Sequence, residues 1–198
     1  MGACCSDEPP PPPIVTVTHT HAQHAYNPYP PVQQQPAYPP MPTPYSPPAN
    51  ASVDLDYKWI PCQLGQPLPH RAVHGGRDVD GTQIYVGRAY HEGDNLPAKV
   101  IPEKNVCYVA YGGGEHLKYN YEVLVEREFQ WIPCSDGSIP GDAVVAGQTC
   151  DGEALYVGRV YHDGAQTVGK VQPSHGCLYV PFDGEERSFT HYEVLAYQ

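Results

Sequence analysis

An internal repeat constrains this 198-residue chain more than any single motif. Residues 59–62 (WIPC) recur 72 positions later, and residues 85–88 (YVGR) recur 71 positions later, so one residue has been lost in between. Self-similarity at a fixed spacing is typical of a duplicated structural unit. We therefore predict two tandem repeats, 59–130 and 131–198. The other matched segments are 80–81 with 151–152, 90–93 with 161–164, 99–100 with 170–171, and 121–124 with 192–195.

Each repeat has the pattern of β-structure. Short runs rich in Val, Ile and Tyr are separated by Gly, Asp and Pro, and no window keeps a helical period. We expect strands at 84–90, 106–111 and 119–125, with turns at 91–93 and 112–114. The predicted fold class is all-β, with two pseudo-symmetric repeats packed as one compact antiparallel body. About 140 residues suffice to bury a core without disulfides.

Residues 1–58 have a different composition. Fifteen of the 24 prolines lie in 7–58, and aliphatic residues are sparse. Such a segment cannot bury enough apolar surface to offset the entropy of ordering, so we predict a disordered tail with polyproline II character. Prolines spaced as in 36–39 and 44–47 resemble ligands of SH3 or WW domains, although the basic flank is missing. Docking of such a partner and a role as spacer both stay open.

The first six residues fit a double lipid anchor. Gly2 stands in an N-myristoylation pattern, and Cys4 and Cys5 are placed for palmitoylation. One acyl chain holds a protein only marginally, and no Lys or Arg precedes Lys58 to help. No signal peptide or apolar stretch of membrane-spanning length is present. We expect a lipid-anchored protein on the cytoplasmic face of the plasma membrane or of vesicles, not a secreted one.

Charge and cysteine usage narrow the class of function. The formal net charge of −11 argues against a nucleic-acid partner, which would need a basic surface. If Cys4 and Cys5 carry lipid, five of the seven cysteines remain and cannot all pair, which favours a reducing compartment. We find no nucleophile elbow, phosphate-binding loop or zinc spacing. We therefore expect no enzyme, no metal and no cofactor.

The repeated motifs identify a family. The segments WIP, GGRDVDG, YVGRAYHEG, PAKV, YGGGE and YEVL resemble the DM9 repeat, and the resemblance covers 59–198 as two tandem copies. Family members include invertebrate mannose-binding lectins with two repeats. Natterin-type toxins carry the repeat beside an aerolysin-like pore module. This chain has no room for such a module, so the resemblance does not imply pore formation.

The resemblance implies a mannose site. In the lectins, the sugar is held by an Asp and a Lys that correspond here to Asp78 and Lys99. The second repeat keeps Lys170 but has Thr149 in the position of Asp78, so a site there would need the nearby Asp151 as its carboxylate.

Glu92 and Glu115 are weaker sugar-binding candidates. A carboxylate accepts from neighbouring hydroxyls and an ammonium donates to others, while aromatic rings cover the apolar face of the sugar. The alternative is that the carboxylates cap turns and Lys99 makes a surface ion pair. The counterparts of the two glutamates are Asp163 and Glu186, and the aromatic candidates are Tyr85, Tyr90, Tyr156 and Tyr161.

Together these features predict a lipid-anchored, lectin-like recognition protein that binds mannose-type glycans, with innate immune surveillance as its setting. The alternative is a membrane-associated adaptor whose repeats bind proteins and whose Pro-rich tail recruits partners. Whether the chain forms a homodimer stays open.

Overall fold

The computed structural model describes residues 57–125 and 128–198, all within the unit Met41–Gln198. These residues form fourteen strands and two short 3-10 helices, without an α-helix among them, so the all-β prediction is confirmed. None of the described residues belongs to a helix that could cross a membrane. Nearly all of the tail lies outside the described residues, including Gly2, Cys4 and Cys5. The acylation of these three residues stays a prediction.

The two repeats contain the same series of elements, each with a 3-10 helix after its fourth strand. The predicted strands correspond to β3, β5 and β7. In the first repeat the elements are β1 (Lys58–Gln63), β2 (His74–Arg77), β3 (Gln83–His91), β4 (Asp94–Ile101), η1 (Pro102–Lys104), β5 (Val106–Tyr111), β6 (Gly114–Leu117) and β7 (Asn120–Val125). In the second they are β8 (Phe129–Ser135), β9 (Val145–Gln148), β10 (Ala154–His162), β11 (Ala165–Gln172), η2 (Pro173–His175), β12 (Cys177–Phe182), β13 (Glu185–Phe189) and β14 (His191–Tyr197).

Tight turns set the hairpins. The β3–β4 turn has positive φ at Glu92 (49°) and Gly93 (99°), and the β10–β11 turn repeats this at Asp163 (44°) and Gly164 (87°). Two successive positive φ values match the right-handed twist of the flanking strands, and glycine adopts them without steric cost. The predicted turn at 91–93 is therefore confirmed.

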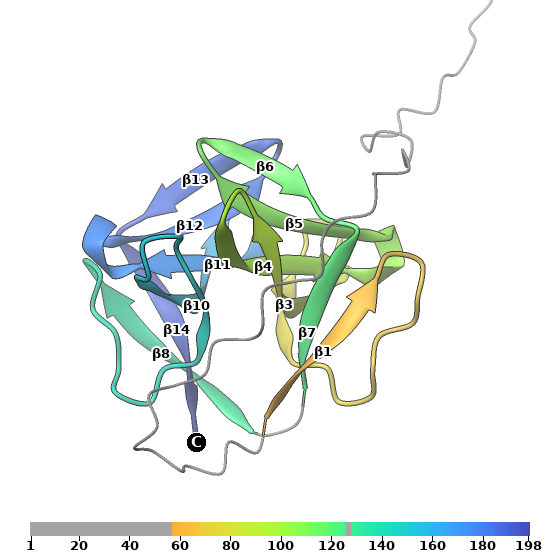
Figure 1. Ribbon diagram of the computed structural model, residues 1–198, viewed down its shortest axis with the longest axis horizontal. Helices are drawn as coiled ribbons and strands as arrows, with labels where there is room; N and C mark the ends of the chain where they lie inside the picture. The colour runs from red at the N-terminus through yellow and green to blue at the C-terminus, as the bar shows by residue number, and fades with distance from the viewer. Residues whose placement is uncertain (1–56, 126–127) are drawn as a thin grey trace, which may run out of the picture. The chain divides into compact units, whose positions relative to one another are not determined.

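Strands of one repeat pair with strands of the other. β2 meets β11 at Arg77 and Gln166, and β4 meets β9 at Asn95 and Gln148. β6 and β13 form a third cross-repeat pair and lie side by side at the top of Figure 1. These pairings join all fourteen strands into one sheet, and the extra pairings β3–β4 and β10–β11 close it on itself. The prediction of one antiparallel body made of two pseudo-symmetric repeats is confirmed.

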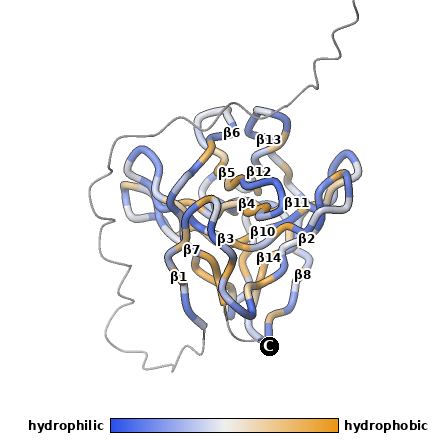
Figure 2. The backbone as a smooth tube through the Cα atoms, turned by 90° about the vertical axis from the view of Figure 1, so that its right-hand side faces the viewer, coloured by the Kyte–Doolittle hydropathy of each residue, from blue (hydrophilic) through white to orange (hydrophobic). Residues whose placement is uncertain are grey.

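The core is shared between the repeats. Figure 2 shows hydrophobic segments gathered along the inner strands and hydrophilic ones on the hairpin tips. One cluster combines Val86 and Leu124 with Val157 and Leu195, all at most 1% exposed. The five cysteines among the described residues are free, so burial of side chains and sheet hydrogen bonds stabilise this body without disulfides.

Two arginines occupy equivalent structural positions. Arg88 donates a 2.6 Å hydrogen bond to Glu122 and lies 4.6 Å from the ring centroid of Trp59. Arg159 donates to Glu193 at 2.6 Å and lies 4.2 Å from Trp131. Each arginine therefore pairs with a glutamate of the neighbouring strand, and the two tryptophans pack against the shared core.

Candidate functional site

The lysines expected to hold a sugar are buried. Lys99, in β4, is 6% exposed; its Nζ lies 2.9 Å from Glu115 Oε1 and donates to the Pro181 carbonyl at 2.7 Å. Lys170, in β11, is also 6% exposed and lies 3.0 Å from Glu186 Oε1. We call these four charged side chains the lysine–glutamate cluster. The structure thus brings Lys99 together with the candidate Glu115, and Lys170 with the counterpart of Glu115.

The lysine–glutamate cluster joins the repeats. The second carboxylate oxygen of Glu115 accepts from the Gly184 amide, and that of Glu186 accepts from the Gly113 amide, both at 2.8 Å. Each ammonium also faces aromatic rings from both repeats, at centroid distances of 5.2–5.9 Å: Tyr108 and Phe182 for Lys99, Tyr111 and Tyr179 for Lys170. These groups stabilise the contact between β6 and β13.

Asp78 has a different cationic partner. It begins a turn in which its carbonyl accepts from the Gly81 amide at 2.9 Å, and its Oδ2 lies 2.6 Å from Lys104 Nζ. Asp80 also pairs with Lys104, at 2.8 Å. Hydrogen bonds from Lys104 and Thr82 hold the pKa of Asp80 well below its usual range. Asp78 and Lys99 are thus each paired elsewhere, and the structure does not bring them together as a pair.

The remaining candidates lie at exposed turns. Glu92 sits at the tip of the β3–β4 hairpin, and Asp151 sits in the turn equivalent to that of Asp78. In that second turn the Thr149 hydroxyl accepts from the Glu153 amide at 3.1 Å. His175 stands where the first repeat has Lys104, and its ring bonds Tyr179 instead, at 3.1 Å. The second turn therefore lacks the Asp–Lys pair of the first.

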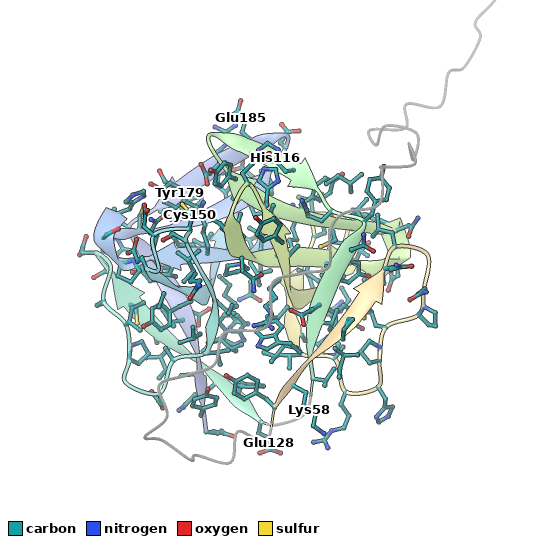
Figure 3. All side chains as sticks on the ribbon, viewed as in Figure 1. Lys58, His116, Glu128, Cys150, Tyr179 and Glu185 are labelled. Atoms are coloured by element: carbon teal, nitrogen blue, oxygen red, sulfur yellow. The ribbon has the colours of Figure 1, made fainter. Side chains whose placement is uncertain are left out.

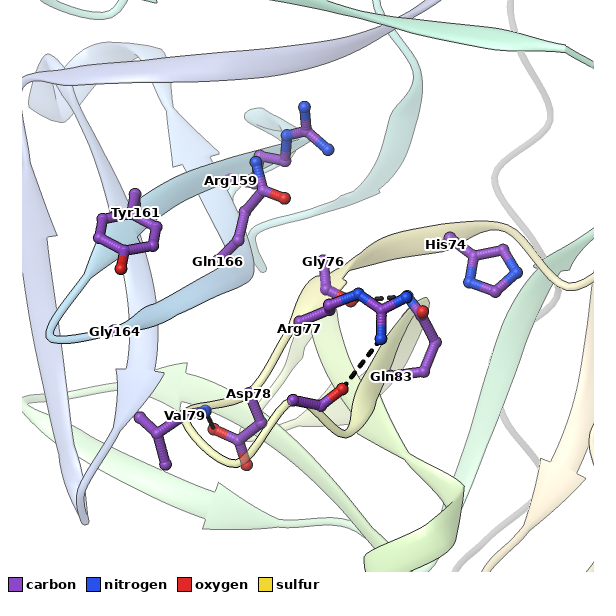
Figure 4. A pocket seen from close by; sticks show the side chains of 11 residues that line it. His74, Gly76, Arg77, Asp78, Val79, Gln83, Arg159, Tyr161, Gly164 and Gln166 are labelled. Atoms are coloured by element: carbon purple, nitrogen blue, oxygen red, sulfur yellow. Dashed lines mark hydrogen bonds between the residues drawn. The ribbon is translucent and has the colours of Figure 1, made fainter.

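An open cleft of about 530 Å³ lies between the Asp78 turn and the tip of the β10–β11 hairpin. Figure 4 shows Tyr161 and Gln166 on one side, with Arg77 and Asp78 on the other. Tyr161 is 73% exposed, so its ring is free to cover a ligand. Because one wall comes from each repeat, the cross-repeat pairing of β2 with β11 creates this cleft.

The polar groups of the first-repeat wall are fixed in place. Arg77 donates to the Gly81 carbonyl at 3.0 Å, and Gln83 donates to the Gly76 carbonyl at 2.6 Å. Asp78 accepts from the Val79 amide through Oδ1, at 2.9 Å, while Lys104 holds Oδ2. Sequence reasoning identified Asp78 and Tyr161 but missed Arg77, Gln83 and Gln166. No local pattern marks those three, since the pairing of the repeats brings them together.

A histidine pair distinguishes the first repeat from the second. The rings of His91 and His116 are 4.4 Å apart, and His91 Nδ1 lies 3.3 Å from Lys118 Nζ (Figure 3 labels His116). Burial lowers the pKa of His91 to about 4, with Lys118 and His116 acting in the same direction and Glu92 and Asp94 opposing them. His91 is therefore neutral near pH 7.

This depressed pKa predicts a loss of stability in acid. In the unfolded chain His91 binds a proton near pH 6.5, whereas in the folded protein it binds one only near pH 4. Between these values the unfolded state holds more protons, so the free energy of unfolding should fall as the pH drops from 6.5 to 4. Urea unfolding of wild type and His91→Phe at several pH values checks this. The variant should lose less stability over that window, and an identical loss would contradict the assignment.

Comparison with known proteins identifies the family. The model of the DM9 repeat matches residues 78–189, more than half of the chain. The chain belongs to the DM9 repeat family. The matched region includes the Asp78 turn, both lysine–glutamate pairs and the β10–β11 hairpin.

Relatives with the DM9 repeat are longer proteins. The chain is 37% identical to Natterin-3 of Thalassophryne nattereri over 93 residues, which is 45% of this chain and 23% of that protein. It is 30% identical to Natterin-1 of the same fish over 148 residues, 72% of this chain and 38% of that one. The chain thus spans well under half of either relative.

A solved structure shows a similar fold. The crystal structure of the nematode sperm cell motility protein MFP2B superposes with a TM-score of 0.55, covering 71% of this chain and 46% of that one at 13% identity. At this identity the likeness concerns the fold alone.

Proposed function

We propose that this protein is a lectin-like, non-catalytic binding protein, and that the cleft between its repeats takes a mannose-type sugar. The observation that carries the proposal is an exposed aromatic ring, Tyr161, across an open cleft from the polar groups of the Asp78 turn. A sugar has an apolar ring face and a rim of hydroxyls, and this lining offers a partner to each. The volume of about 530 Å³ is within the range of small-molecule sites.

The roles of the side chains follow from their chemistry. The carboxylate of Asp78 accepts hydrogen bonds from sugar hydroxyls, and Arg77 donates to sugar oxygens. Gln83 and Gln166 can do both. Because Lys104 and the Val79 amide already orient the Asp78 carboxylate, little ordering cost remains at binding. Lys99 and Lys170 support this site indirectly, since they hold the repeats together.

Membership of the DM9 repeat family supports a binding function. Mannose as the ligand, the lipid anchor at Gly2, Cys4 and Cys5, and innate immune surveillance are further parts of the proposal, and they rest on the sequence.

Removing the aromatic face should weaken binding. We expect Tyr161→Ala to lower the affinity for a mannose glycan about tenfold, since losing a ring contact worth about 1.4 kcal/mol changes Kd by that factor. Tyr161 is 73% exposed, so the variant should keep the stability of the wild type. Calorimetry with methyl α-mannoside or a mannose oligosaccharide measures the effect.

Tyr90→Ala is the matched control, because Tyr90 is the counterpart of Tyr161 in the first-repeat hairpin. We expect it to leave the affinity unchanged. If wild type and Tyr161→Ala bind equally, the cleft is not the site. If the full chain binds no mannose glycan on an array or in solution, the sugar proposal fails and the adaptor alternative gains support.

A further inference from the structure

The symmetry of the repeats implies a second cleft, between the β3–β4 hairpin and the turn at 149–152. There the polar wall has been replaced: Arg77 corresponds to Gln148, Asp78 to Thr149 and Gln83 to Ala154. Gln148 and Thr149 keep shorter or uncharged polar groups, and Ala154 keeps none. The second wall thus offers a sugar fewer hydrogen bonds and no carboxylate at the position of Asp78.

Equivalent backbone amides in the two turns donate to carboxylates from different places. In the first turn, the Val79 amide donates to Asp78 of its own turn at 2.9 Å. In the second turn, the equivalent Cys150 amide donates to Asp94 Oδ1 at 2.8 Å. Asp94 comes from the hairpin of the other repeat, so this bond spans the place where the second cleft would open.

Asp94 closes the hairpin against the turn. It is only 7% exposed, and a Cβ placed on the neighbouring Gly93 would lie 3.3 Å from the Cys150 Cβ. On the open side Ala165 replaces Asp94, and a Cβ on Gly164 would meet no atom within 4 Å. A buried carboxylate that accepts from a backbone N–H makes a strong, charge-assisted bond. The equivalent tyrosines of the two hairpins show the same difference: Tyr90, on the closed side, is 36% exposed, whereas Tyr161, on the open side, is 73% exposed.

We infer that the chain has one open cleft and one that Asp94 holds shut, so that a single chain binds one glycan. This inference rests on the proposed function for its ligand. The closure itself depends only on the Asp94–Cys150 contact. Two differences between the repeats explain the asymmetry. Thr149 has no carboxylate to accept from the Cys150 amide, and the carboxylate of Asp94 accepts from it instead, across from the other repeat.

Binding stoichiometry tests the inference with ligand. Calorimetry or native mass spectrometry of the full chain with a mannose oligosaccharide should show one equivalent bound. Tyr161→Ala should weaken that single site, and Tyr90→Ala should leave it intact. Two equivalents on the wild type, with one unaffected by Tyr161→Ala, would overturn the inference while the lectin function stands.

Amide hydrogen exchange tests the closure without ligand. Exchange of the Cys150 backbone amide with deuterium, followed by NMR on the full chain, should become several-fold faster in Asp94→Ala, because that amide then loses its acceptor, Asp94 Oδ1. Asp163→Ala is the control, because Asp163 is an exposed acid at the tip of the other hairpin and should leave the rate unchanged. An unchanged rate in Asp94→Ala overturns the closure. If no glycan binds at all, the single-site claim falls with the proposed function, while the exchange rate of the Cys150 amide still decides whether Asp94 closes the second cleft.

Discussion

Replacing Lys99 with methionine is expected to lower the free energy of unfolding by about 3–5 kcal/mol. The Lys99 and Glu115 side chains are 7% and 10% exposed, so the substitution leaves a buried carboxylate without its cation. The Gly184 amide still donates to Glu115, but a hydrogen bond from one uncharged amide does not replace the lost positive charge. Urea unfolding measures the change.

A double variant separates charge from packing. In Lys99→Met/Glu115→Gln the amide oxygen can still accept from Gly184, and neither position carries an unpaired charge, so most of the lost stability should return. The ion pair of Arg187 and Glu185 provides the control, because these side chains are 45% and 59% exposed. Arg187→Met should lower the free energy of unfolding by well under about 1 kcal/mol. A cost for Lys99→Met as small as that of Arg187→Met would show that the buried pair does not hold the repeats together.

Replacing Gly76 with alanine is expected to destabilise the protein by about 3 kcal/mol or more, at the upper end of overpacking effects. A Cβ at this position would lie 1.9 Å from the Gln166 carbonyl oxygen, where β2 meets β11. Backbone cannot move aside as a flexible side chain can, so the two repeats would have to separate there. Thermal or urea unfolding measures the loss.

Gly141→Ala is the matched control for Gly76→Ala. A Cβ on Gly141 would meet no atom within 4 Å, and its φ is not in the left-handed region, so the change should stay within about 0.5 kcal/mol of wild type. Equal stability of the Gly76 and Gly141 variants would contradict the close approach of β2 and β11. Since the close approach of β2 and β11 also forms the cleft, Gly76→Ala should lower the affinity for any ligand that binds in the cleft.

Local sequence determined much of the β architecture. The runs rich in Val, Ile and Tyr, bounded by turn residues, predict strands: 84–90 lies within β3, and 106–111 has the same bounds as β5. Glycine placed the hairpin tips, since Gly93 and Gly164 adopt positive φ without steric cost. The repeat itself predicted the pseudo-symmetric duplication.

Only the tertiary structure decided which distant strands and side chains pair with each other. Local periodicity sets which face of a strand is buried but carries no information on which distant strand pairs with it, so β2–β11 and β6–β13 could not be read from the pattern. The joint site of Asp78 and Lys99 was predicted from the resemblance to the lectins, not from a local pattern. In the fold, Lys99 faces Glu115, and Asp78 faces Lys104.

The candidate site shows the same division. The sequence determined that Asp78 has Thr149 as its counterpart and that Asp94 has Ala165. Only the fold shows that these two exchanges concern one backbone amide, because residues 94 and 150 become neighbours only when the hairpin of one repeat packs against the turn of the other. Hydrogen bonds between segments far apart in the chain form where the packing of the whole core places them.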